Sequence, residues 1–153
     1  MSDTTAVPTV GSRLADIALT GPDGTATSLD RVRDGRRAVA YFLRASSCVI
    51  CLGHARALGA MAAAGELGDT AVILVTPGDA AQAAQAMARL EGTGAAVWAS
   101  GEAHAEVGLG SFLAIQHSGS FLIDADGTLR YTRASTLPMG SFSRTELLDA
   151  LSE

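Results

Sequence analysis

Short apolar runs alternate with helical patterns through the middle of the chain. Residues 38–43 and 71–76 are nearly continuously apolar, which is typical of strands buried on both faces of a sheet, and residues 96–99 are a shorter candidate strand. The intervening segments repeat apolar side chains every three or four residues, which predicts helices from Cys48 to Gly65 or Gly68 and over residues 80–90. The side chains at this spacing in the first helix are Ile50, His54, Leu58 and Met61.

The two ends of the chain add hairpins and a closing helix. A Gly-Pro-Asp-Gly turn at residues 21–24 separates two candidate strands, and Asp126-Gly127 separates two more. Ser28 and Ser143 are well placed to cap the short helical turn and the final helix that follow them. The predicted elements outside the middle of the chain are strands at 14–19, 25–28, 120–124 and 129–133, and helices at 29–32, 102–107 and after Ser143.

This order of elements predicts the fold class. Buried strands that alternate with helices favour an α/β protein with a central mixed β-sheet flanked by helices, here extended by an N-terminal β-hairpin. Residues 1–12 are small and polar, so we expect a flexible N-terminal arm. The 153-residue chain has no repeat and no linker-like segment, so residues 13–153 are expected to form one domain.

Composition and charge narrow the function classes. The formal net charge of −5 argues against nucleic acid as a partner, because such proteins carry basic patches. The start of the chain lacks the basic and apolar regions of a secretory signal, and no apolar run of about 18 residues predicts a membrane span. The expected location is therefore the cytoplasm, and the sequence implies no organic cofactor.

The only two cysteines of the chain, Cys48 and Cys51, lie where a predicted strand meets a predicted helix. In a reducing compartment a CxxC pair is more often catalytic than structural. A sulfur at a helix start lies beside unpaired N–H groups and the positive end of the helix dipole, which favour a thiolate at Cys48. Cys51, one turn further along, is placed to attack whatever forms on Cys48. That product is a sulfenic acid if the substrate is a peroxide and a mixed disulfide if it is a disulfide.

Neighbouring polar residues have a functional and a plain interpretation. Arg44 either stabilises the thiolate and orients a peroxide or is a strand-end arginine facing water. Ser46 and Ser47 either donate hydrogen bonds to the site or cap the helix. Tyr41 is expected to pack against the helix, and His104 is expected to be solvated in a polar loop.

A metal site is the main alternative to thiol chemistry at this junction. Two thiolates and one or two imidazoles can hold zinc or copper, and the set would be Cys48, Cys51, His54 and His117. No second close pair of ligands exists in the sequence, and His54 is more simply a histidine on a helix face. A vestigial or purely structural cysteine pair is a further alternative.

Three stretches of the chain resemble the AhpC/TSA (redoxin, peroxiredoxin-like) family of the thioredoxin-like superfamily. Residues 14–29 are similar to the N-terminal hairpin that redoxins add before the thioredoxin core. The segment from Tyr41 to Arg44 followed by Cys48-Val-Ile-Cys51 resembles the family's FxR…CPxC signature, and Ser120-Phe-Leu-Ile-Asp-Ala-Asp-Gly127 resembles its TFxIDxDG hairpin.

The resemblance implies a thioredoxin-like fold and a peroxiredoxin-like thiol oxidoreductase. Its implied site residues are Cys48 as nucleophile, Cys51 as resolving cysteine, and Arg44 and Ser47 beside them. Its implied partners are a peroxide or disulfide substrate and a thioredoxin-type or low-molecular-weight thiol reductant, and relatives often form homodimers. A general thiol–disulfide reductase and a non-enzymatic metal-binding or redox-sensing module are the alternatives.

The sequence also departs from the family at the positions that activate peroxide. Efficient peroxiredoxins carry a proline seven residues and a threonine or serine three residues before the peroxidatic cysteine, whereas this chain has Tyr41 and Ala45 there. Ser118 stands where relatives place an arginine or a cis-proline, three residues before the strand phenylalanine. The label "peroxiredoxin-like" therefore fits the sequence better than "peroxiredoxin".

Overall fold

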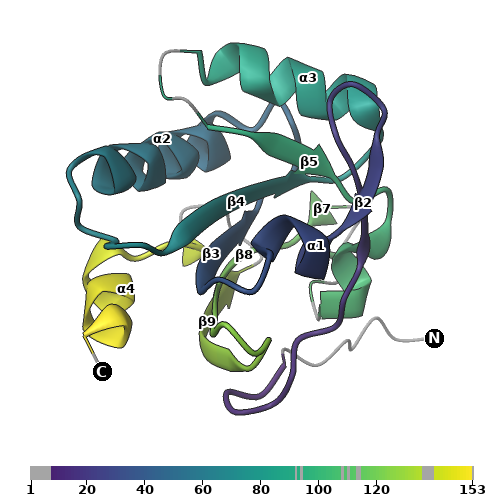
Figure 1. The fold of residues 1–153 in the computed structure, drawn as a ribbon. Coiled ribbons are helices and arrows are strands. Elements are labelled where there is room, and N and C mark those ends of the chain that lie inside the picture. Colours follow the sequence, from purple (N-terminus) through teal and green to yellow (C-terminus); the bar gives the residue numbers. More distant parts are fainter. Residues whose placement is uncertain are drawn as a thin grey trace.

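A seven-stranded mixed sheet forms the centre of the molecule (Figure 1). The computed structural model describes residues 8–91, 93, 95–107, 109, 111–112, 115–135 and 140–152. In spatial order the strands of the sheet are β2 (Ala26–Ser28), β1 (Ala18–Thr20), β5 (Val97–Ala99), β4 (Ala71–Thr76), β3 (Ala38–Phe42), β8 (Ser118–Ile123) and β9 (Leu129–Ser135). A separate two-stranded ribbon is made by β6 (Ser111–Phe112) and β7 (Ile115–Gln116).

The middle of the sheet is parallel and its two edges are antiparallel. β3 pairs in parallel with β4, and β4 in parallel with β5, so the carboxyl ends of these three strands lie at the same edge. β8 runs antiparallel to β3, with Ser120 opposite Tyr41 and Gly119 opposite Phe42. All five residues of β3 are fully buried, which explains the unbroken apolar sequence of this strand.

The helices follow the predicted capping signals. They are α1 (Leu29–Arg33), α2 (Val49–Ala63), α3 (Ala80–Arg89), the 3₁₀ helix η1 (Ala103–Val107) and α4 (Arg144–Leu151). Ser28 and Ser143 accept hydrogen bonds as the N-caps of α1 and α4, as predicted. Asp79 and Gln82 form a capping box at the start of α3, in which each side chain bonds to the other residue's backbone.

Two hydrophobic clusters fill the two faces of the sheet. One packs α2, α3 and α4 against the sheet, and the other packs α1, η1 and the segment that leads into β1 (Figure 1). Because side chains alternate along a strand, Tyr41 faces the first cluster and Phe42 faces the second. The cysteines belong to the first cluster.

The predicted α/β class and order of elements are confirmed, with local differences. The strand predicted at 14–19 is shorter and comprises only β1, although Leu14 and Ile17 are buried outside it. The ribbon of β6 and β7 was not predicted. Ile50 is 43% exposed, because Cys51 rather than Ile50 takes the inward position of the first turn of α2.

Part of the predicted N-terminal arm contacts the sheet. The Gly11 N–H donates to the carbonyl of Leu129 at 2.8 Å, and the Leu129 N–H donates to the carbonyl of Ser12 at 2.8 Å. Residues 1–7 of the predicted arm lie outside the described residues. The division into an arm at 1–12 and a domain at 13–153 stays a prediction.

Candidate thiol redox site

Cys48 is the N-cap of α2. Its backbone is extended, and its Sγ accepts a hydrogen bond from the N–H of Cys51 at 3.3 Å. This is the position of a capping serine or aspartate, occupied here by sulfur, and a negative charge there is favoured by the helix dipole and the free N–H groups. The helix start that was predicted at or just after Cys48 is confirmed.

Cys51 lies one turn further along, with its side chain fully buried. Its Sγ accepts a hydrogen bond from the backbone N–H of Arg44 at 3.3 Å. Burial, followed by the hydrogen bond with Cys48, raises the pKa of the Cys51 thiol to about 11, although the Arg44 amide acts in the opposite direction. Both cysteines are free thiols, and Cys48 is 4% exposed against 0% for Cys51. Cys48 is thus the more accessible of the two.

Arg44 contacts the site through its backbone and buries part of its side chain. Its Nε is buried and has no hydrogen-bond partner among the residues that the structure describes. The interpretation of Arg44 as an arginine that simply faces water is therefore wrong for this atom. A buried N–H without a partner costs free energy, so this donor is uncompensated within the described residues.

The serines beside the cysteines do not cap the helix, because Cys48 does so itself. Ser46 is buried and donates from Oγ to Oε1 of Gln85 on α3 at 2.7 Å. Ser47 is exposed. Ser118, at the start of β8, is buried, and its Oγ has no hydrogen bond of normal geometry among the described residues, although it lies near the Tyr41 hydroxyl.

Tyr41 links Cys51 to the rest of the first cluster. Its hydroxyl lies 2.9 Å from His54 Nδ1 and 2.9 Å from Ser141 Oγ, and it also lies near the Cys51 thiol. Burial is the main cause that raises the pKa of this phenol above its usual value. The predicted packing of Tyr41 on α2 is confirmed by its edge contact with the His54 ring, whose centroid lies 5.7 Å away. The sequence analysis did not predict the hydrogen bonds of the Tyr41 hydroxyl, since Ser141 is far away in the sequence.

His104 is fully buried, so the prediction that it is solvated is wrong. Its Nε2 lies 3.0 Å from the carbonyl of Leu43, and its Nδ1 lies 2.7 Å from Ser100 Oγ. Burial lowers the pKa of His104 to about 4. η1 follows β5 at the carboxyl edge of the parallel strands and carries this imidazole across to the end of β3. The apolar residues Ala103, Val107 and Leu109 around His104 were the sequence signal for this burial.

The residues proposed as a metal site are not brought together. Among the described residues, no three His, Cys, Asp or Glu side chains lie close enough to share a metal ion. His54 is a helix-face histidine whose Nδ1 is engaged by Tyr41, and desolvation lowers its pKa. His117 lies immediately before β8 and is partly buried. The zinc or copper hypothesis is therefore not carried forward.

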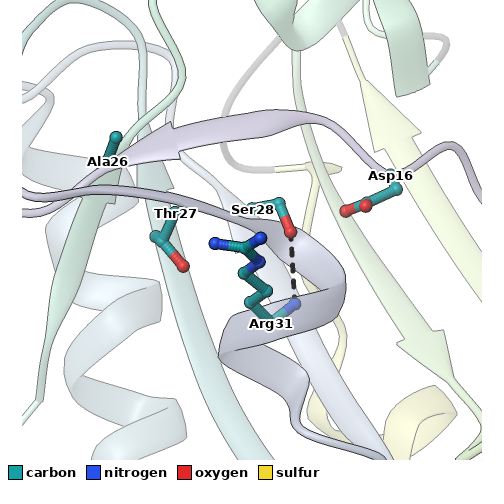
Figure 2. A pocket seen from close by; sticks show the side chains of 5 residues that line it. All are labelled: Asp16, Ala26, Thr27, Ser28 and Arg31. Carbon is teal, nitrogen blue, oxygen red and sulfur yellow. Dashed lines mark hydrogen bonds between the residues drawn. The ribbon is translucent and has the colours of Figure 1, made fainter.

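Besides a pocket of about 240 Å³ near Gly11 and Leu129, two pockets lie at the N-terminal hairpin. Figure 2 shows one of about 360 Å³ at the N-terminal hairpin, lined by Asp16, Ala26, Thr27, Ser28 and Arg31. The dashed line there is the capping bond from the Arg31 N–H to Ser28 Oγ, 3.3 Å long. The other, about 450 Å³, lies between the Gly-Pro-Asp-Gly turn and the residues around Trp98. Neither is lined by a cysteine, so neither belongs to the thiol site.

The match of the chain to a family model defines the class of the protein, a thiol-dependent oxidoreductase. The chain belongs to the Redoxin (AhpC/TSA) family, whose model matches residues 9–151. The comparison with curated proteins gives no match by sequence. Within the described residues, no helix is long and apolar enough to cross a membrane.

Solved structures confirm the predicted thioredoxin-like fold. The chain is similar to the peroxidoxin BcpB of Mycobacterium tuberculosis, with 16% identity over 94% of this chain and 96% of that one and a TM-score of 0.78. It is similar to reduced Prx3 of Vibrio vulnificus in complex with H₂O₂, with 16% identity, coverage of 95% and 99%, and a TM-score of 0.77. A secreted disulfide oxidoreductase of M. tuberculosis has 16% identity, coverage of 89% and 94%, and a TM-score of 0.62. At such identities the likeness establishes the fold alone.

Proposed function

We propose that the protein is a peroxiredoxin-like thiol peroxidase in which Cys48 reacts with peroxide and Cys51 resolves the product. The observation that carries the proposal is the Cys48 sulfur at the N-cap of α2, bonded to the N–H of Cys51. This position stabilises a thiolate, which is the nucleophilic form of cysteine. The other thiol lies within one helical turn, as a dithiol reaction requires.

The reaction has an oxidation, a condensation and a reduction. The Cys48 thiolate attacks one peroxide oxygen, the O–O bond breaks, and the other oxygen leaves as an alkoxide or hydroxide that takes up a proton. Cys51 then attacks the sulfur of the Cys48 sulfenic acid, forms the Cys48–Cys51 disulfide and releases water. Two thiols of a thioredoxin-type protein or of a small thiol reduce this disulfide and are themselves oxidised to a disulfide.

Two residues, Arg44 and Ser118, favour a substrate that contains oxygen. Each carries a buried polar side-chain atom that lacks a normal hydrogen bond in the described part of the chain. A peroxide or sulfenic oxygen can accept from Arg44 Nε, which would offset the cost of burying that donor. Ser47 is exposed next to Cys48, where its hydroxyl could reach the outer oxygen of a bound peroxide; we propose this as its role.

Mass spectrometry after one equivalent of hydrogen peroxide tests the mechanism. We expect the wild-type protein to lose two mass units, as a Cys48–Cys51 disulfide forms. Cys51→Ser should instead trap a sulfenic acid on Cys48, detectable as a dimedone adduct. Cys48→Ser should abolish peroxide turnover, since the variant lacks the nucleophile. A trapped adduct on Cys51 in place of Cys48 would reverse the two assigned roles.

Reduction of protein disulfides is the second candidate function. It is favoured by Val49 and Ile50, which lie between the cysteines and are 73% and 43% exposed. Apolar side chains exposed beside a reactive thiol suit the docking of a polypeptide. Stopped-flow measurements separate the two candidates: a peroxide rate no higher than that of free cysteine, together with rapid reduction of a protein disulfide, would favour the reductase.

The proposal also covers the cellular location and the oligomeric state of the protein. We propose a cytoplasmic location, in which thiols are kept reduced and a CxxC pair is more often catalytic than structural. We also propose a homodimer, on the resemblance to redoxins that pair through sheet edges. Sedimentation equilibrium of the reduced and oxidised protein tests the dimer, and a monomer in both states would contradict it.

A further inference from the structure

The proton of Cys51 needs a path across the protein. The Cys51 side chain is fully buried, and burial holds its thiol protonated at neutral pH. As a resolving nucleophile it must lose that proton, and as a leaving group in the reductive step it must regain one. Water has no direct access to this sulfur, so a neighbouring side chain has to carry the proton.

Tyr41 and His54 lie in series between this sulfur and the surface. The Tyr41 hydroxyl lies near the Cys51 thiol, with which it interacts electrostatically, and 2.9 Å from His54 Nδ1 on the other side. Tyr41 is fully buried, whereas His54 is partly exposed on α2. The side chains are held in place by the edge contact of the two rings and by Phe142, whose ring centroid lies 5.3 Å from that of His54.

We propose that Tyr41 and His54 form a proton relay that serves Cys51. Tyr41 is the catalytic member, because it touches a reacting thiol, and His54 acts through Tyr41. The proposal rests on the proposed dithiol function and adds residues that the family resemblance does not supply, since Tyr41 occupies the position of the proline in efficient peroxiredoxins.

The steps balance in both directions. During resolution the Cys51 S–H proton moves to the Tyr41 oxygen while the phenol proton moves to His54 Nδ1, and the imidazole passes a proton to water through its other nitrogen. The Cys51 thiolate then displaces hydroxide from Cys48, and the hydroxide takes up a proton as water. During reduction a thiolate attacks Cys48, Cys51 leaves as a thiolate, and the same chain returns its proton.

The other partners of the Tyr41 hydroxyl do not provide this route. Ser141 is fully buried, and Ser118 is 1% exposed, so neither reaches solvent. Each is a neutral hydroxyl without a basic nitrogen to take up the proton. His54 is the partner that combines a ring nitrogen able to take up a proton with partial exposure, and burial lowers its pKa, which favours the neutral imidazole in the resting protein.

Two variants remove the relay in different ways. Tyr41→Phe deletes the hydroxyl, and His54→Asn keeps a hydrogen-bond acceptor near Nδ1 that cannot carry a proton. Ser141→Ala is the matched control, because it removes another partner of Tyr41 and leaves the Tyr41–His54 pair in place. Circular dichroism and the denaturation midpoint check that each variant is folded, and His54→Asn serves as the test if Tyr41→Phe is not.

The measurement is the rate at which Cys51 resolves an adduct on Cys48, as a function of pH. We expect both relay variants to slow this step by about 100-fold at pH 7, in the range of a lost proton-transfer group. Their rates should then rise tenfold per pH unit, because Cys51 must ionise without help, whereas wild type and Ser141→Ala should show a flatter profile. The rate of the first reaction at Cys48 should not change.

The adduct is made in two ways, so that the relay and the peroxidase proposal can fail separately. One is the sulfenic acid formed with hydrogen peroxide, and the other is the mixed disulfide of Cys48 with glutathione. If peroxide gives no adduct in wild type, the peroxidase proposal fails, and the glutathione adduct still tests the relay. Unchanged resolution rates and pH profiles in a folded relay variant would overturn the relay.

Discussion

Two aromatic–histidine pairs sit back to back on β3 and differ in what they can do. Tyr41 meets His54 on one face of the sheet, with ring centroids 5.7 Å apart and an interplanar angle of 83°. Phe42 meets His104 on the other face, at 4.9 Å and 80°. The two pairs have nearly the same geometry, and consecutive residues of one strand supply their aromatic rings.

The difference lies in the hydroxyl and in the exposure of the imidazole. Leu43 offers His104 Nε2 only a carbonyl, which fixes the proton on Nε2, and Nδ1 then accepts from Ser100. With both nitrogens engaged and no exposed surface, His104 is a neutral structural group. His54 is partly exposed and bonds through Nδ1 to a phenol that also contacts Cys51. Similar pairs thus serve the fold on one face and the chemistry on the other.

The largest expected effect comes from removing His104. His104→Ala should lower the free energy of unfolding by about 4 kcal/mol, because it leaves a cavity and deprives the Leu43 carbonyl of its buried donor. His54→Ala should cost about 1 kcal/mol, since its side chain is partly exposed and water can replace it. Urea denaturation monitored by circular dichroism measures both values. Equal losses in the free energy of unfolding at the two positions would contradict the assignment of His104 to a structural role and of His54 to a functional one.

The contrast between the two histidines also shows where sequence reasoning succeeds. The unbroken apolar run of β3, the turn at 21–24 and the caps Ser28 and Ser143 fixed the elements, because each rests on local chemistry that neighbouring residues report. Cys48 was located at the helix start for the same reason. The fold class follows from the order of such elements.

What could not be predicted depends on residues that are distant along the chain. The Tyr41 hydroxyl meets Ser141, which is 100 positions away, and His104 meets the carbonyl of Leu43, 61 positions away. The polar neighbours Glu102 and Glu106 suggested a solvated histidine, but a 3₁₀ turn directs residue 104 inward while they stay outside. Ile50 was grouped with the helical apolar spacing, yet the first turn of α2 gives the inward position to Cys51.

Acid should destabilise the protein through His104. Its folded-state pKa is lowered to about 4, so below its usual value near 6.5 the unfolded chain binds a proton that the folded protein does not. Stability is therefore unaffected by His104 above pH 6.5 and is lost as the pH falls from 6.5 toward 4. We expect this group to contribute about 2 to 3 kcal/mol of loss between pH 7 and 4.5.

The difference between wild type and His104→Asn isolates this contribution, because the carboxylates titrate in both. The loss of stability between pH 7 and 4.5 should be smaller in the variant by that amount. As an independent check, the imidazole NMR signals of His104 should stay those of the neutral form down to about pH 5. Protonation of folded His104 near pH 6.5 would contradict its assignment as a neutral structural group.

A smaller loss of stability than that of His104→Ala is expected from placing a hydroxyl on the opposite face of β3. Phe42→Tyr makes the two pairs alike in composition, but both nitrogens of His104 already have partners, and Phe42 is fully buried against Phe121 with ring centroids 5.4 Å apart. The added hydroxyl would lack a partner, so we expect a loss of about 2 kcal/mol in the free energy of unfolding. Tyr41→Phe deletes a hydroxyl that has partners, and its main effect should be on the resolution rate of Cys51. The free energy of unfolding and the rate of resolution by Cys51 should be measured on both variants. If Phe42→Tyr slows resolution as strongly as Tyr41→Phe does, the hydroxyl of Tyr41 has no special role, and the two faces of β3 are not functionally distinct.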